Sequence, residues 1–485
     1  MTSLKQKSIN GVLWSFFDQF ANLGITFIVG VFLARILSPK EYGLIGMVTV
    51  FIAVSTVFIN SGFANALIRK KDCTEDDYST VFIFNFITSL IFYFILFITA
   101  PFISTFFHEI QLIAILRVLA IVLIIDSLSI IQSTILVKRV DFKLQARISI
   151  VSSALGGILG LVLALNDFGV WALVFMQLSS RAINTMLLWC WNKWKPNWNF
   201  SKSSFNELFG FGSKLLISGL IDTLFRNINL LVIGKYFNAI QLGYYTRAEQ
   251  YNMVPAQSIT GIVSRVTYPV LAQMQDDEAK LKQNYKQIVK SVMFVSFNIM
   301  LGVAATAEAM IHALIGHKWE QTIIYLQLLS FVGMMYPLHA LNLNILQVKG
   351  KSDLFLRLEI IKKVMAIPIL FIAIFYGIKS MIIGTCISSL IAYYLNSYWS
   401  GKLIKYPIRE QLTDLIPSLM FAVFMAVVVY FSASIFTASV WITLFFQLLV
   451  GVIVVVLTGE LFKNESYIFL KDILLSQLNK LTKNG

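Results

Sequence analysis

Charged residues are scarce in this sequence. Lys, Arg, Asp and Glu together make up 13% of its 485 residues, about half the share that is typical of a soluble globular domain. Hydrophobic residues make up 57%, and the mean hydropathy is +0.76. A single buried core does not explain so large a shortage, which argues against a soluble protein. Apolar runs of about twenty residues recur along the chain, and each is long enough to cross roughly 30 Å of hydrocarbon. The composition therefore predicts an all-α, multi-pass integral membrane protein.

Cysteine is also rare. Cys73, Cys190 and Cys386 stand singly, with no CxxC pair and no histidine cluster, so neither a disulfide framework nor a metal site is expected. The Gly-Lys-Ser stretch at 350–352 lacks the glycine that a phosphate-binding loop requires five residues earlier, because Ile345 stands there. We therefore predict no metal, no cofactor and no ATPase site in this chain.

Long apolar segments predict fourteen transmembrane helices. The predicted ranges are 11–36, 43–68, 79–100, 112–136, 145–166, 169–191, 208–235, 242–271, 287–315, 320–346, 356–377, 380–400, 411–434 and 440–461. The first range is too long for a signal peptide and lacks a small-residue cleavage site, so we interpret it as an uncleaved span.

The distribution of basic residues predicts the orientation. With the N-terminus inside, the cytoplasmic segments hold 26 of the 39 Lys and Arg residues, as expected from the cytoplasmic bias of these residues. The outside connections hold only Arg35, Lys40, Lys235, Lys318 and Lys379. Both termini are therefore predicted to be cytoplasmic. The net charge of +14 then reflects orientation and contact with anionic membrane lipid, and it gives no support to nucleic-acid binding.

An internal repeat divides the predicted helices. The stretch "FLARILSPKEYGLIGMV" (32–48) aligns with "VIGKYFNAIQLGYYTRA" (232–248) at an offset of 200, which pairs Gly43 with Gly243. Six predicted spans separate the two copies, so the halves point the same way and would be related by a pseudo-two-fold axis along the membrane normal. The predicted organisation is an N-terminal six-helix lobe at 1–200, a C-terminal six-helix lobe at 201–403, helices 13 and 14 at 404–462, and a cytoplasmic amphipathic tail at 463–485.

Ionisable residues inside the predicted spans are the candidate functional residues. An ionisable group at this depth costs at least about 2.5–3.5 kcal/mol, so it is expected to face protein or water. Asp222 and Arg226 lie four residues apart on one helical face. We predict a water-filled cationic cavity between the lobes in which arginines bind the anionic head of an amphiphile, because the guanidinium fork suits phosphate oxygens. The predicted ligands of this anionic head are Arg181, Arg226, Arg247 and Arg265; the polar lining is Asn22, Gln177, Asn184, Asn229, Gln250 and Gln257; and the groups for ion coupling or charge pairing are Asp222, Asp126 and Glu308.

Other interpretations of these residues stay open. Arg226 and Asp222 also fit a neutralised structural pair, and Arg247 and Arg265 lie near span ends, where long side chains reach the interface. Arg181 stands in mid-span with no acid within one turn of its own helix, which makes it the best single candidate for a ligand contact.

Four stretches carry a resemblance to a known family. "LARILSPKEYGLIGM", "LLVIGKYFNAIQLGYYTRAEQY", "TYPVLAQMQDD" and "QVKGKSDLFLRLEIIKKV" resemble the polysaccharide-transporter, Wzx-like branch of the multidrug/oligosaccharidyl-lipid/polysaccharide (MOP) exporter superfamily. The resemblance extends from about residue 5 to residue 410, and it implies two six-helix lobes plus two extra spans. It further implies a flippase that moves an undecaprenyl-pyrophosphate-linked oligosaccharide to the outer leaflet, next to possible polysaccharide-assembly proteins. The cavity arginines are not a fixed motif of the family.

Two other functions compete with this prediction. A drug/cation antiporter of the same superfamily would favour an acidic cavity, whereas this one is predicted to be basic. A membrane polysaccharide polymerase or ligase would need a sizeable outer loop with basic residues, whereas the outside connections here are short.

Overall fold

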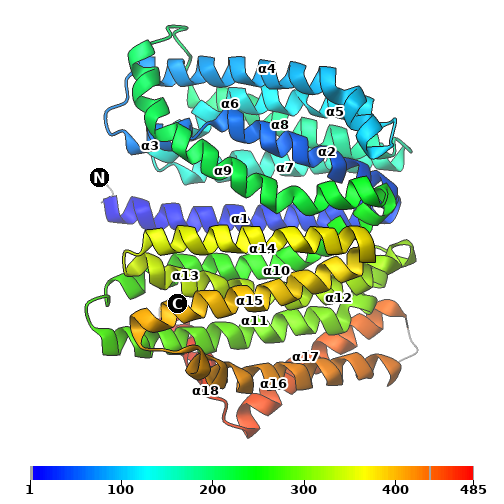
Figure 1. Cartoon of the computed structure of the whole chain (residues 1–485), viewed down its shortest axis with the longest axis vertical. Coiled ribbons are helices and arrows are strands. Elements are labelled where there is room, and N and C mark those ends of the chain that lie inside the picture. Colours follow the sequence, from blue (N-terminus) through cyan, green and yellow to red (C-terminus); the bar gives the residue numbers. More distant parts are fainter. Residues whose placement is uncertain (1–3, 436–438, 484–485) are drawn as a thin grey trace. The chain divides into compact units, whose positions relative to one another are not determined.

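The computed structural model describes residues 4–435 and 439–483, and throughout these ranges the regular structure is helical, with no strand (Figure 1). The chain divides into two compact units, residues 1–246 and residues 247–485. The prediction of an all-α chain is confirmed.

The first unit contains nine complete helices and the start of a tenth. They are α1 (Leu4–Ile36), α2 (Pro39–Asn60), α3 (Phe63–Arg69), α4 (Glu75–Phe107), α5 (Leu112–Leu119), α6 (Ile121–Lys138), α7 (Phe142–Leu165), α8 (Val170–Asn192), α9 (Lys202–Tyr236) and the first turns of α10 (Ala239–Ala272). Helix α7 packs against both α1 and α8, while α6 contacts α4 and α8 (Figure 1).

Glycines on α7 explain how closely its neighbours approach. A Cβ atom on Gly156 would lie 2.6 Å from the Cβ of Ser180 in α8, and one on Gly157 would lie 2.6 Å from a methyl group of Val29 in α1. Small residues at such positions allow the close helix contacts that hold membrane helices together in the absence of a hydrophobic driving force.

The second unit is built around the 37-residue helix α11. Its helices after α10 are α11 (Glu278–Leu314), η1 (His317–Trp319), α12 (Glu320–Gly333), α13 (Tyr336–Val348), α14 (Ser352–Tyr376), α15 (Ile378–Ile404), α16 (Ile408–Ser432), η2 (Ala433–Ile435), α17 (Val440–Leu461) and α18 (Glu465–Lys483). Helix α11 contacts α12, α13, α16, α17 and α18, and buried residues such as Val289, Met293 and Phe297 on α11 form one core cluster with Leu338 and Leu341 of α13.

Eleven segments of the described chain are long and apolar enough to cross a membrane. The remaining three predicted spans, 169–191, 242–271 and 356–377, coincide with the helices α8, α10 and α14, which are less apolar because they carry polar and charged residues within their length. The predicted helices exist in these places, but their composition alone does not identify them as spans.

Three predicted spans are wrong as single helices. The range 43–68 is interrupted at Ser61 and Gly62, which both adopt left-handed backbone conformations (φ 43° and 70°). The range 112–136 is divided between α5 and α6 at Ala120, and the range 320–346 is divided before α13, whose first turn holds Pro337. By contrast, α10 continues through Pro255 and Pro269. A glycine in the left-handed region and a proline in a first turn are ordinary ends of helices.

The two copies of the repeat contact each other reciprocally within the first unit. A Cβ atom on Gly43 would lie 1.7 Å from the carbonyl oxygen of Ala239, and one on Gly243 would lie 1.9 Å from that of Pro39. The pairs Pro39/Ala239 and Gly43/Gly243 are the equivalent positions of the repeat. The starts of α2 and α10 therefore pack backbone against backbone, as two elements related by a local two-fold axis do.

Candidate functional site

Arg181 lies in the middle of α8 and finds an acidic neighbour on another helix. Its Nε atom is 3.8 Å from Oδ1 of Asp126 on α6, and its side chain is 60% exposed whereas that of Asp126 is 21% exposed. The two charges lie at the outer limit of an ion pair, and much of the guanidinium surface remains accessible. Sequence reasoning named Asp126 as a group for ion coupling or charge pairing, but it compared Arg181 only with acids on its own helix and so did not pair the two residues.

The polar face of α8 continues on both sides of Arg181. Gln177 and Asn184 are partly buried and lie four residues before and three residues after it, a spacing that places the three side chains on one face of the helix. The three side chains therefore share one face of α8, and that this face lines a cavity stays a prediction.

Asp222 and Arg226 are both exposed side chains on α9. Further along the same helix, the Asn229 amide donates a hydrogen bond to the hydroxyl of Tyr245, with 3.3 Å between Nδ2 and the oxygen. The first unit thus carries Arg181 and Arg226 of the predicted arginines, and α10 carries Arg247 and Arg265 in the second unit.

Asn22 belongs to a polar cluster between α1 and α7. Its amide nitrogen lies 2.6 Å from Oδ1 of Asp18 and 2.8 Å from the Ser149 hydroxyl, and its amide oxygen accepts a hydrogen bond from Ser153 at 2.6 Å. With these contacts, Asn22 holds α1 and α7 together, in addition to any part it has in lining a cavity.

In the second unit, the predicted residues of α10 differ in exposure. Arg247 and Gln250 are partly buried, whereas Gln257 and Arg265 are exposed. Glu249 is a partly buried carboxylate on the same helix. It was not among the residues that the sequence predicted to line the cavity.

His339 on α13 has both ring nitrogens in contact with α15. Nε2 lies 2.9 Å from the Ser389 hydroxyl, and Nδ1 lies 3.4 Å from the amide nitrogen of Asn396. These contacts are those of a structural histidine whose polar atoms are satisfied, rather than those of a group left available for proton transfer.

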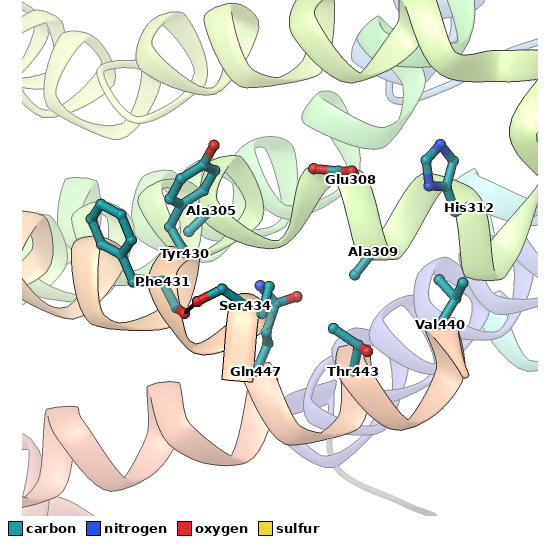
Figure 2. Close-up of a pocket in the computed structure, with 11 residues that line it drawn as sticks. Ala305, Glu308, Ala309, His312, Tyr430, Phe431, Ser434, Val440, Thr443 and Gln447 are labelled. Atoms are coloured by element: carbon teal, nitrogen blue, oxygen red, sulfur yellow. Dashed lines mark hydrogen bonds between the residues drawn. The ribbon is translucent and has the colours of Figure 1, made fainter. Parts of the chain in front are cut away.

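Glu308 lines a cavity of about 430 Å³ between α11, the end of α16 and α17 (Figure 2). Its polar lining consists of Glu308, His312, Tyr430, Ser434, Thr443 and Gln447. Figure 2 shows Ala305 and Ala309 of α11 facing Gln447 and Thr443 of α17, so small side chains on α11 leave the space open. In the described part of the chain, no group of three His, Cys, Asp or Glu side chains has the arrangement of a metal site.

Lys70 forms two ion pairs at the end of the first unit that is predicted to face the cytoplasm. Its ammonium lies 2.9 Å from a carboxylate oxygen of Asp77, which is 1% exposed, and 3.0 Å from one of Glu207 on α9. The hydrogen bond to Asp77, followed by that to Glu207, raises the pKa of Lys70 above its usual value. Asp77 also closes a capping box with Thr74 at the start of α4, so one buried carboxylate holds the cap and the ion pair together.

The sequence matches one family over most of its length. Residues 32–324 fit the family of polysaccharide biosynthesis proteins, and because this range is more than half of the chain, the protein belongs to that family.

Individual relatives are similar over long alignments. The teichuronic acid biosynthesis protein TuaB of Bacillus subtilis (strain 168) is 27% identical over 357 residues, which is 73% of this chain and 74% of TuaB. The lipopolysaccharide biosynthesis protein WzxC of Escherichia coli (strain K12) is 24% identical over 412 residues, 84% of this chain and 82% of WzxC.

Solved structures share the fold. The lipid II flippase MurJ in an inward closed conformation superposes with a TM-score of 0.76 at 15% identity, covering 94% of this chain and 99% of MurJ. An inward-facing multidrug resistance MATE family transporter of the MOP superfamily gives a TM-score of 0.61 at 18% identity, covering 79% of this chain and 94% of the transporter. At these identities the comparison establishes the fold.

Proposed function

We propose that this protein is a flippase for an undecaprenyl-pyrophosphate-linked oligosaccharide, which it moves from the inner to the outer leaflet during the synthesis of a surface polysaccharide. The family assignment supports this function, as do the names of the relatives, which concern lipopolysaccharide and teichuronic acid biosynthesis. The protein is a transporter without covalent catalysis, and its partners are the lipid-linked oligosaccharide, membrane lipid and proteins of polysaccharide assembly.

The proposed architecture has fourteen spans in a bacterial inner membrane with both termini in the cytoplasm. Its two six-helix lobes are residues 1–200 and 201–403, followed by helices 13 and 14 at 404–462 and the tail at 463–485. The eleven apolar segments support eleven of the spans, and the positions of α8, α10 and α14 support the other three. Alternating access between the lobes then exposes one cavity to each side of the membrane in turn.

The observation that carries the proposed site is the guanidinium of Arg181. A mostly exposed arginine in the middle of a membrane helix, with the Asp126 carboxylate at 3.8 Å, has N–H groups left to donate to another anion. A diphosphate accepts such bidentate hydrogen bonds and also compensates the cost of a charge at this depth of the membrane. Arg226 joins Arg181 in binding the pyrophosphate. Arg247 contacts the substrate at the outer approach to the cavity and Arg265 at the inner approach, and the six polar side chains predicted above line the cavity.

The acidic groups have different roles in this proposal. Asp126 is the charge partner that holds Arg181 in place between transport cycles, because the two side chains are already within 3.8 Å. Asp222, one turn from Arg226 on α9, is the candidate for coupling transport to an ion gradient.

Replacement of Arg181 tests the function and the site together. Arg181→Ala should abolish surface polysaccharide without lowering the protein level, and Arg181→Lys should retain only a small part of it, since an ammonium lacks the bidentate fork. Arg147→Ala on the exposed face of α7 is the matched control and should have no effect. Full production of polysaccharide by Arg181→Ala would remove Arg181 from the site.

The leaflet in which single lipid-linked repeat units accumulate distinguishes the competing functions. In cells that lack the protein, a flippase predicts accumulation on the inner leaflet. Accumulation on the outer leaflet would instead identify a polymerase or ligase, and no accumulation would favour the drug/cation antiporter.

A further inference from the structure

Two neighbouring cavities on the second unit meet at one side chain. Gln447 of α17 lines both the polar cavity beside Glu308 and a groove of about 530 Å³ between α11, α16 and α17. A polar cavity joined to a long apolar groove has the shape of a site for an amphiphile.

The polar cavity offers acceptors that lack donors. Gln447 is 2% exposed, and its amide nitrogen donates to the carbonyl of Val429 at 3.1 Å, while its Oε1 has no hydrogen-bond partner in the described part of the chain. The exposed carboxylate of Glu308 lines the same cavity and adds a negative charge to it. A buried amide oxygen without a donor is costly, so the cavity suits a ligand that carries both N–H donors and positive charge.

His312 adds a polar atom of the opposite kind. It lies one turn after Glu308 on α11, and its Nε2 atom is buried with no hydrogen-bond partner among the residues described. A ring N–H at this position can donate to an anionic oxygen. The cavity therefore pairs an acceptor set with a donor, which matches a zwitterionic headgroup.

The groove provides the apolar half of the site. Its lining consists mainly of aliphatic side chains of α11 and α17, and it includes Gly302, Gly451 and Met425. A Cβ atom on Gly302 would meet only the terminal methyl of Met425, at 3.7 Å, so the absence of a side chain there keeps the groove deep. A hydrocarbon chain laid in such a groove gains contacts on several sides.

We propose that this face of the second unit binds an aminophospholipid with an ethanolamine headgroup. The ammonium donates to the Glu308 carboxylate and to Oε1 of Gln447, His312 donates to the phosphate, and one acyl chain fills the groove over Gly302. Choline lipids have no N–H to offer Gln447, and glycerol lipids leave the Glu308 charge uncompensated. The preference for a primary ammonium therefore follows from the acceptors themselves.

Lipid binding can be measured on the intact, purified protein without a transport assay. Native mass spectrometry would follow retention of phosphatidylethanolamine, phosphatidylcholine and phosphatidylglycerol with identical acyl chains. The wild-type protein should retain phosphatidylethanolamine preferentially. Glu308→Gln should reduce this preference about tenfold or more, as expected for loss of a hydrogen bond to a charged group. Asp353→Asn, which changes an exposed carboxylate at the start of α14, is the matched control and should leave it unchanged.

The groove has its own test. Gly302→Leu should weaken retention of all three lipids alike, because the new side chain occupies the space of the acyl chain. Equal retention of the three lipids by the wild-type protein, or an unchanged preference in Glu308→Gln, would overturn the headgroup assignment. Wild-type retention by Gly302→Leu would overturn the assignment of the groove. These results do not depend on the proposed flippase activity, since none of them measures transport.

Discussion

The contact between the starts of α2 and α10 makes a sharp prediction about one methyl group. In Gly43→Ala the new Cβ would lie 1.7 Å from the carbonyl oxygen of Ala239 and 2.5 Å from its carbonyl carbon. Carbon and carbonyl oxygen normally approach no closer than about 3.3 Å, so the helices must separate by roughly 1.6 Å. The obstacle is backbone rather than a flexible side chain, and it cannot rotate away.

Two opposing contributions decide whether Gly43→Ala raises or lowers the free energy of unfolding. Replacing glycine by alanine inside an exposed helix normally stabilises it by about 0.5–1 kcal/mol. Forcing extra atoms into a packed contact typically costs about 1–3 kcal/mol, and sometimes more. Because the overlap at Gly43 involves a whole atomic radius, we expect the cost to exceed the gain, with a net destabilisation of about 1–2 kcal/mol. Gly243→Ala, whose Cβ would lie 1.9 Å from the Pro39 carbonyl oxygen, should behave in the same way.

Thermal unfolding of the purified protein in detergent measures this effect. The matched control is Gly210→Ala on α9, where a Cβ would meet nothing within 4 Å, and it should be neutral or slightly stabilising. The double variant at Gly43 and Gly243 should lose less than the sum of the two single losses, since one separation relieves both contacts. If Gly43→Ala is as stable as Gly210→Ala, the reciprocal backbone contact does not exist as described.

The remaining predictions concern residues whose contacts are structural. Lys70→Met should destabilise the protein by about 1–3 kcal/mol because it leaves the buried Asp77 carboxylate without its cation, while Lys71→Met at a neighbouring exposed position should have little effect in the same thermal assay. The pairing raises the pKa of Lys70, so on the alkaline side the stabilisation is lost only as the pH rises past the usual lysine value of 10.5. A stability difference between the two variants that vanished between neutral pH and pH 9 would contradict this assignment. His339→Gln should lower stability by about 1 kcal/mol through loss of a ring contact and leave the pH profile of polysaccharide export unchanged, whereas an altered profile would identify a proton-transfer role.

The sequence predicted the helices well because their signal is local. Apolar runs and their polar interruptions marked helices in all fourteen predicted ranges, including α8, α10 and α14, which fall short of the composition of a span. The breaks at Ser61 and Ala120 were not predicted, because neither residue is a helix breaker, whereas the break before α13 lies beside Pro337, a residue type that indicates a kink. At Gly62 the chain does approach a neighbouring helix closely, because a Cβ there would lie 2.6 Å from the carbonyl oxygen of Gly212 on α9.

The candidate site was predicted only in part. A stripe such as Gln177, Arg181 and Asn184 follows from helical periodicity, so its shared face could be recognised without a structure. The partner of Arg181 could not, because Asp126 is 55 positions away in sequence and reaches it from another helix. The same limit applies to Glu308, whose neighbours Tyr430 and Gln447 come from helices more than a hundred residues later.

The sequence by itself identified a membrane protein, its helical segments, the repeat that pairs Gly43 with Gly243 and the family to which the chain belongs. Each of these conclusions rests on composition, periodicity or local sequence similarity. Only the tertiary structure decided which side chains meet: Arg181 with Asp126, His339 with Ser389 and Asn396, and Gln447 with both a polar cavity and an apolar groove. The physical reason is that periodicity fixes the face of a helix on which a residue lies, whereas the neighbour of that face depends on how separate helices pack.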